Sequence, residues 1–122
     1  MPLAFLLDED FPGPIILAIR AHNRAGIYPI DFVRMGDLPD LPFSSDDKAV
    51  LLWAERENRL LVSLDKGTVP KHLKDHLAAG NHSPGVLLVR PMARTARVVE
   101  HLVLIAYAGE PDEWKDRIEY IP

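Results

Sequence analysis

Short apolar runs alternate with longer stretches of helical spacing along this chain of 122 residues. The runs are almost continuously apolar rather than alternating, which is typical of strands in a parallel sheet that is buried on both faces. Between the runs, apolar positions recur every three or four residues, as in helices that cover such a sheet. This order of elements predicts an open, mostly parallel sheet with helices on both of its faces.

We expect five strands, over residues 3–7, 28–33, 60–64, 85–89 and 118–121. We expect the intervening helices to begin near Pro12, Ser44–Ser45, Thr68 and Thr95, and to end near Gly26, Asn58, Gly80 and Gly109. Residues 35–43 contain one glycine and two prolines and predict a loop. The chain, residues 1–122, is therefore expected to form a single α/β domain, a three-layer α/β/α sandwich around a central sheet of four to five strands.

Composition narrows the class of protein only slightly. The chain has 14 Lys+Arg and 18 Asp+Glu, and its net charge of −4 argues against broad binding of nucleic acid but not against binding at a local basic patch or through a metal. The absence of cysteine excludes a disulfide framework, a thiolate zinc site and a cysteine nucleophile. No apolar run approaches the roughly 18 residues that span a bilayer, and the early acidic residues are unlike a signal peptide. We therefore expect a soluble, cytoplasmic protein.

Acidic residues follow two of the expected strands. Residues 8–10 read Asp-Glu-Asp after the first strand, Asp65 follows the third, and residues 46–47 place two further Asp at the start of the helix between them. Because the carboxyl ends of parallel strands share one edge of a sheet, these carboxylates could converge there. Converging carboxylates repel one another, and Mg²⁺ or Mn²⁺ relieves that repulsion with oxygen ligands. Such an ion can activate water for attack on a phosphodiester.

The same acids also have a purely structural interpretation. Asp46 and Asp47 would stabilise a helix N-terminus by about 0.3–1 kcal/mol each without any metal. The sequence Asp-Lys-Gly at residues 65–67 is compatible with an ordinary turn. Spacing alone therefore leaves the metal site and the caps and turns as open alternatives.

Several motifs occur together in a set order: Leu-Leu-Asp-Glu-Asp-Phe-Pro at 6–12, Asp47, Trp-Ala at 53–54, Arg-Leu-Leu-Val-Ser-Leu-Asp-Lys at 59–66 and Pro-Gly-Val-Leu-Leu-Val-Arg at 84–90. In this order the chain resembles PIN-like domains, in particular a small group related to the VapC toxins. The resemblance covers roughly residues 3 to 105.

The resemblance implies a PIN-like fold and a metal-dependent endoribonuclease, in the manner of the toxin of a toxin–antitoxin pair. Asp8, Asp47 and Asp65 would hold Mg²⁺ or Mn²⁺, and Glu9 would be a supporting acid. The implied partners are RNA and an antitoxin protein.

One departure from the family concerns the position two residues after Asp65. The family usually has a second Asp there, and this chain has Gly67 followed by Thr68. The Thr68 hydroxyl could order a water or a phosphate oxygen, but it cannot replace the charge. Asp46 lies where the family often has Ser and could compensate in part. Loss of the acid weakens metal binding and puts catalysis in question.

Basic residues near the expected strand ends are candidates for binding a nucleic-acid backbone. Lys66 adjoins the acids, and Arg90 and Arg94 follow the fourth strand, although a plain surface role is the more frequent one for such residues. His72 and His76 have a spacing that can hold a metal, but no third ligand is evident, so we interpret them as two exposed histidines.

Two further expectations concern apolar residues on helices. Trp53 lies at a helical position and is expected in the core or in an interface rather than as a base-stacking platform. The helix over residues 95–108 is apolar on all sides, which allows a homodimer face as well as a core role.

Three other interpretations remain open. The first is a PIN-like domain that has lost catalysis and serves in binding or assembly. The second is a receiver-type phosphoacceptor domain, which also has acids after its first strand and an Asp after its third; it needs a Lys after its fifth strand, and residues 118–122 contain none. A phosphatase of the haloacid-dehalogenase type is weaker still, because residues 8–10 lack the Thr that should follow.

Overall fold

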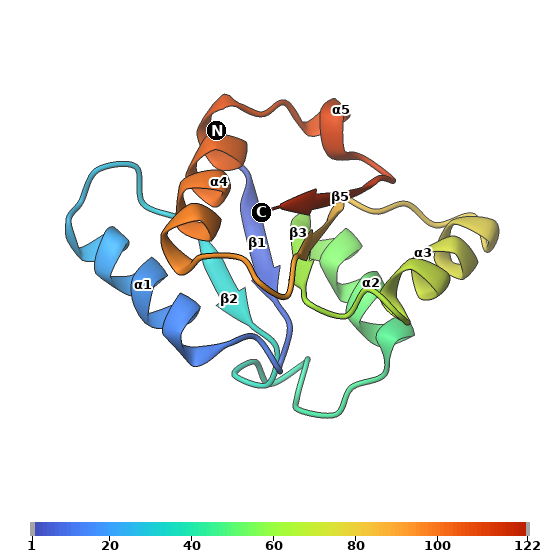
Figure 1. Cartoon of the computed structure of the whole chain (residues 1–122). Helices are drawn as coiled ribbons and strands as arrows, with labels where there is room; N and C mark the ends of the chain where they lie inside the picture. Colours follow the sequence, from blue (N-terminus) through green and yellow to red (C-terminus); the bar gives the residue numbers. More distant parts are fainter. Residues whose placement is uncertain (1, 122) are drawn as a thin grey trace.

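The computed structural model describes residues 2–121 as strands and helices in alternation (Figure 1). The strands are β1 (Ala4–Leu7), β2 (Phe32–Arg34), β3 (Arg59–Ser63), β4 (Val86–Val89) and β5 (Ile118–Ile121). The helices are α1 (Gly13–Arg24), α2 (Asp47–Glu57), α3 (Val69–Ala78), α4 (Thr95–Ala108) and α5 (Pro111–Trp114).

The five strands form one parallel sheet in the order β2-β1-β3-β4-β5. In the register of the central pair, Leu6 of β1 lies opposite Leu61 of β3. The same order occurs in flavodoxin-like doubly wound sheets. The predicted α/β architecture, with helices on both faces of a central parallel sheet, is confirmed.

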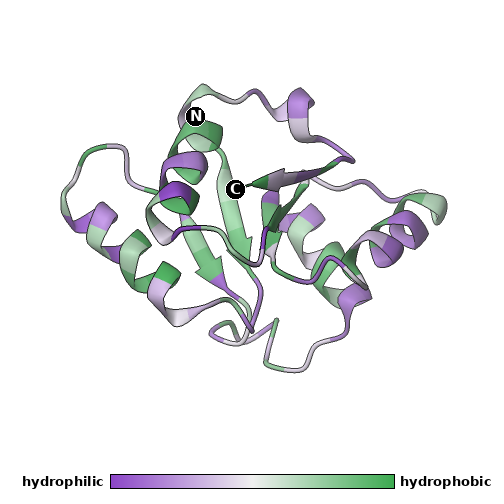
Figure 2. Ribbon diagram, in the orientation of Figure 1, coloured by the Kyte–Doolittle hydropathy of each residue, from purple (hydrophilic) through white to green (hydrophobic). Residues whose placement is uncertain are grey.

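Alternate side chains of the strands enter two separate apolar clusters. Phe5 and Leu7 face one cluster, which contains the buried residues of α1 and α4. Leu6 faces the other cluster, which contains the buried residues of α2 and α3. Figure 2 shows green apolar positions on the strands and on the helix faces turned toward them, with purple polar positions outside. The strands are apolar throughout because both of their faces are covered.

The crossover from β4 to β5 has the opposite hand from the other three. In the strand order, β2 lies to one side of β1 and β5 lies to the opposite side of β4, so the two crossovers run in opposite directions. Their helices α1 and α4 nevertheless cover the same face of the sheet. The crossovers through α2 and α3, on the other face, share the hand of the first. About 98% of parallel crossovers are right-handed, and we assign that hand to the three crossovers that agree. The connection through α4 is then left-handed. Its helix packs against α1, and the carbonyl of Ala106 accepts a hydrogen bond of 2.9 Å from the amide of Leu3.

Local chemistry explains the ends of α2. Asp46 is the N-cap residue, and its side chain accepts a hydrogen bond from the amide of Ala49 at 2.8 Å. Asn58 ends the helix in the left-handed conformation, with φ of 54°. The helix was expected to begin near Ser44–Ser45, with one of these serines as its cap, but the cap is Asp46, and the Ser45 hydroxyl instead donates to the carbonyl of Pro42.

Two other element predictions need correction. The second strand was expected over residues 28–33, but β2 begins further along the chain and has only three residues, Phe32–Arg34. It is an edge strand, so its length is set by its pairing with a single neighbour, β1. The short helix α5 was not predicted. It lies close to Gly85, where φ is +136° and a Cβ would come within 2.8 Å of the Trp114 carbonyl oxygen. Trp53 is buried, as predicted.

Within residues 2–121, no helix has the length and apolar character needed to cross a membrane.

Helix α4 provides a test of the packing. Leu102 is fully buried between α4 and the sheet, whereas Leu104 on the same helix is 59% exposed. Leu102→Ala should lower the free energy of unfolding by about 2–5 kcal/mol, because it removes buried apolar surface and leaves a cavity. Leu104→Ala, the matched control, should change it by no more than about 0.5 kcal/mol. Urea unfolding followed by circular dichroism measures both; similar losses in the two variants would contradict the assigned packing of α4.

Candidate active site

The candidate site lies at the carboxyl edge of the sheet, between β1 and β3. These strands are neighbours, and the chain leaves β1 toward one side of the sheet and β3 toward the other. Such a point, where the direction of strand order reverses, is where open α/β sheets bind ligands. Asp8 follows β1 directly, Asp65 follows β3 by two residues, and α2 begins at Asp47.

Asp8 is half-buried and held in place by Ser63 at the end of β3 and by Glu9 just after β1. Its Oδ2 accepts a hydrogen bond from the hydroxyl of Ser63 at 2.7 Å, and its Oδ1 accepts one from the amide of Glu9 at 2.8 Å. Burial raises the pKa of Asp8 above its ordinary value, and the negative charges of Asp10 and Asp47 raise it further, against the effect of the hydrogen bonds. A carboxylate in this position is poorly solvated and close to other negative charge, so a cation would stabilise it.

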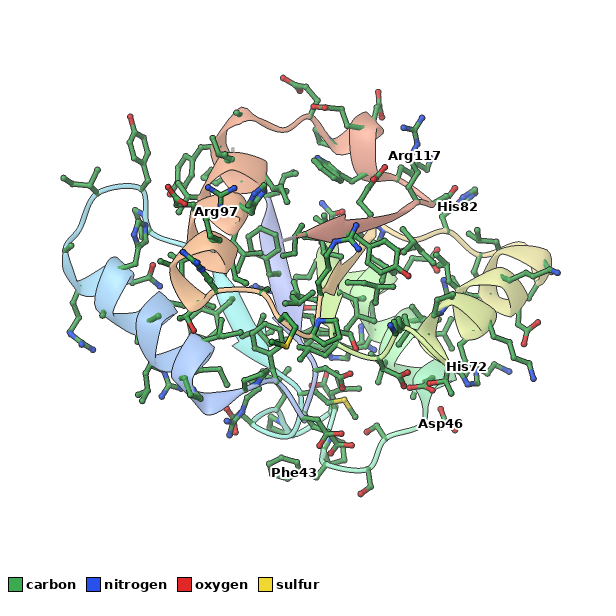
Figure 3. All side chains as sticks on the ribbon, viewed as in Figure 1. Phe43, Asp46, His72, His82, Arg97 and Arg117 are labelled. Carbon is green, nitrogen blue, oxygen red and sulfur yellow. The ribbon has the colours of Figure 1, made fainter. Side chains whose placement is uncertain are left out.

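Asp47 approaches this site from the first turn of α2. Its charge is the smallest of the causes that raise the pKa of Asp8, and its Oδ2 lies 3.1 Å from Nε2 of His72 on α3. Figure 3 shows His72 close to the start of α2, which Asp46 marks. The pair becomes a salt bridge when the imidazole is protonated.

Asp65 directs both carboxylate oxygens into its own turn. Oδ1 accepts hydrogen bonds of 3.0 Å from the amides of Gly67 and Thr68, and Oδ2 accepts the Thr68 hydroxyl. The bond from the Thr68 hydroxyl is the largest of the causes that lower the pKa of Asp65. Asp65 therefore also has the structural role of closing the turn before α3. Thr68, proposed as a partner for a water or a phosphate, is bonded to Asp65 in this structure.

Ser63 connects the two acids and was missed in the sequence. Its hydroxyl donates to Asp8 and accepts from the amide of Asp65 at 3.0 Å. Ser63 is fully buried at the end of β3. A single hydroxyl that interrupts an apolar strand one residue before a turn was a signal that could have identified it.

Glu9 and Asp46 have structural partners close to the site. Glu9 Oε2 accepts a hydrogen bond of 2.9 Å from the amide of Ser44, a residue with φ of 66° in the loop that leads to α2. Glu9 thus braces this loop rather than facing Asp8 directly. Asp46 caps α2 through Oδ1.

Two predicted substrate contacts, Lys66 and Arg90, form no ion pair within residues 2–121. Lys66 is exposed. Arg90 follows β4, and its guanidinium lies 4.8 Å from the centroid of the Tyr120 ring.

The interpretation of His72 and His76 as two exposed histidines was wrong for His76. His76 is buried, and its Nε2 lies 2.7 Å from the carbonyl oxygen of His82 and 3.1 Å from Oε1 of Glu55. Both rings face α2, but His72 pairs with Asp47 in its first turn and His76 with Glu55 near its end, so the two rings do not share a metal position.

The donor set fits a hydrated hard cation better than a closed cage. Across the part of the chain described, no three His, Asp or Glu side chains are grouped closely enough to enclose a metal. Mg²⁺, however, is commonly held by one or two carboxylates together with waters and substrate phosphate oxygens. Asp8 and Asp47 are the two carboxylates with fewer partners: Asp8 accepts one hydrogen bond on each oxygen, and Asp47 has one oxygen paired with His72. Asp65 accepts three hydrogen bonds within its own turn.

Comparisons of this chain with protein-family models, curated proteins and solved structures gave no match.

The raised pKa of Asp8 predicts how stability depends on pH. When the folded pKa of an acid lies above its unfolded value, the folded state binds more protons, and the free energy of unfolding falls as pH rises between the two values. In metal-free protein, Asp8→Asn should therefore be more stable than wild type at pH 7, because it removes the poorly solvated charge. This advantage should shrink as pH falls from the raised folded pKa of Asp8 toward its ordinary value of 3.8, and it should be lost below that value, where Asp8 becomes protonated in both states.

Urea unfolding at several pH values in the presence of EDTA measures this difference. Asp75→Asn is the matched control, because Asp75 is an exposed carboxylate on α3. If the free energy of unfolding of Asp8→Asn differs from that of wild type by the same amount at every pH, burial does not destabilise the Asp8 charge.

Proposed function

We propose that this chain is a metal-dependent endoribonuclease of the PIN-like type, which hydrolyses phosphodiester bonds at the carboxyl edge of β1 and β3. The observation that supports the proposal most strongly is Asp8. Its carboxylate is half-buried at the switch point of the sheet, and its pKa is raised mainly by burial, with a smaller contribution from the charges of Asp10 and Asp47. Such an arrangement destabilises the metal-free protein and favours a bound divalent cation.

In this proposal Asp8 and Asp47 hold Mg²⁺ or Mn²⁺. The ion, when bound, would activate water and neutralise charge that develops on the phosphate. Ser63 fixes the orientation of Asp8 through its hydroxyl, and Asp65 in turn fixes Ser63 through its backbone amide. Asp65 supports the metal position in this way, and a direct bond from Asp65 to the ion would require one of its oxygens to leave its partners in the turn.

The remaining proposed roles concern substrate and neighbouring groups. Glu9 holds the loop that leads to Asp47 through its bond to Ser44. Lys66, Thr68 and Arg90 are the proposed contacts to RNA. The antitoxin partner stays a prediction, and so does the homodimer, for which the exposed Leu104 of α4 is available.

A second candidate function is a PIN-like binding or assembly domain without catalysis. The observation in its favour is that both carboxylate oxygens of Asp65 are bonded within its own turn, next to Gly67. An acid held in this manner stabilises the start of α3 and has few lone pairs left for a metal.

RNA cleavage tests the proposal. Purified protein with Mn²⁺ should cleave an end-labelled mixture of single-stranded RNAs, and EDTA should stop cleavage. Asp8→Asn should lower the rate on the order of 100-fold or more, because the electrostatic stabilisation of developing charge is lost. Asp75→Asn, an exposed acid on the far part of α3, should cleave as wild type does.

Two results would contradict the proposal in different ways. Equal cleavage by wild type and Asp8→Asn would assign the activity to a contaminating nuclease. Absence of cleavage by a wild-type protein that binds Mn²⁺ would favour the binding or assembly function instead.

A further inference from the structure

Three arginines line an open hollow at the junction of β4 and α4. The hollow has a volume of about 260 Å³ and is lined by Arg90, Met92, Ala93, Arg94 and Arg97. Arg90 is the first residue after β4, Arg94 is the N-cap residue of α4, and Arg97 lies in the first turn of that helix. All three arginines are exposed.

The positive charge of this hollow is not neutralised by the described part of the chain. Arg34, Arg56 and Arg59 each pair with an acid at 2.8–3.1 Å. The three arginines of the hollow form no ion pair with any of residues 2–121, and the first turn of α4 contains no acid. On a chain of net charge −4, this concentration of unpaired positive charge favours an anionic ligand.

The hollow lies at the same edge of the sheet as Asp8. Leu88 of β4 is in register with Ser63 of β3, so the carboxyl ends of the two strands are adjacent, about 5 Å apart. Ala93, in the wall of the hollow, and Leu64, just before Asp65, pack against the same apolar cluster. A ligand in the hollow can therefore continue along the edge toward β1.

Arg90 adds an aromatic neighbour to the charged surface. Its guanidinium lies over the ring of Tyr120, which is 46% exposed on β5. Exposed aromatic rings beside arginines provide a stacking surface for bases, and only bases that are not in a duplex can reach it. This favours a single strand over a double helix.

We propose that Arg90, Arg94 and Arg97 bind phosphates of a single-stranded nucleic-acid backbone and direct the strand across the end of β3 to Asp8. Guanidinium groups suit this role because their planar donors bind phosphate oxygens in pairs. The direction toward Asp8 rests on the proposed nuclease function, whereas binding of the strand in the hollow does not.

The test is binding of a fluorescein-labelled oligouridylate of about 12 nucleotides, a length within the site sizes of single-strand binding folds. Fluorescence anisotropy is measured in EDTA at several salt concentrations, so that no cleavage is needed. Each phosphate contact to a single strand contributes about 0.7 to the slope of log affinity against log salt. The variant R90Q/R94Q/R97Q should bind more weakly, with a slope reduced by about 2.

Two matched variants separate local binding from general charge and from damage to the fold. R20Q/R24Q/R117Q removes the same amount of charge from exposed positions, two on the later part of α1 and one just before β5. Figure 3 shows that Arg117 lies far from Arg97. This control should retain most of the wild-type slope. R90K/R94K/R97K retains the charge of the hollow and should also retain the slope.

Several outcomes would overturn the inference: a wild-type protein that does not bind the oligonucleotide at low salt, equal losses in the hollow variant and the control, or a lysine variant as weak as the glutamine variant. Preference for a duplex of the same length would overturn the proposal that the bound strand is single.

Asp8→Asn should bind the oligonucleotide at least as tightly as wild type. Failure of cleavage with binding intact would count against the nuclease alone.

Discussion

Burial of the sheet on both faces determines where polar chemistry can occur in this protein. β1, β3 and β4 lie between two layers of helices, and their interior positions are apolar almost throughout. Polar groups are therefore confined to the strand ends and to the helix starts beside them. Within these three strands the buried polar residue is Ser63, at the end of β3, and its hydroxyl bonds to Asp8 and to the amide of Asp65. The geometry of the candidate site follows from this one constraint.

The left-handed crossover has a consequence for the same edge. Because α4 lies on the face of α1 rather than on the face of α3, its first turn begins beside the end of β4 on the α1 side of the sheet. Arg94 and Arg97 thereby join Arg90 around one hollow. The sheet thus places negative charge between β1 and β3 and positive charge beyond β4, along one continuous edge.

Apolar runs predicted the central part of the fold well. Residues 60–64 were expected as a strand where the structure has Arg59–Ser63, and the helix over 95–108 has the bounds that were expected. Burial on both faces makes such runs unambiguous. The edge strand β2 and the helix α5 were placed less well, because their half-buried or short segments depend on contacts with distant residues such as Gly85.

The candidate site could be predicted only in part. The acids at the strand ends are visible in the sequence, but the bonds that engage Asp65 within its own turn are not, because they depend on the geometry of residues 65–68. His76 is buried because Glu55 and the carbonyl of His82 supply partners from other elements, which helical spacing cannot indicate. The predicted convergence of Asp8, Asp47 and Asp65 is not found, because no three acidic or histidine side chains in residues 2–121 are grouped closely enough to enclose a metal. The charge of Asp47 is only the smallest of the causes that raise the pKa of Asp8.

The central claim is that Asp8 holds a divalent cation at the edge between β1 and β3. Titration calorimetry with Mn²⁺ near neutral pH, on wild type and on Asp8→Asn, tests it most directly. The account predicts one Mn²⁺ bound by the wild-type chain and loss of that binding in Asp8→Asn, with protons released at moderately acidic pH because binding requires the ionised carboxylate. Equal binding of Mn²⁺ by both proteins, or no binding by wild type, would contradict it.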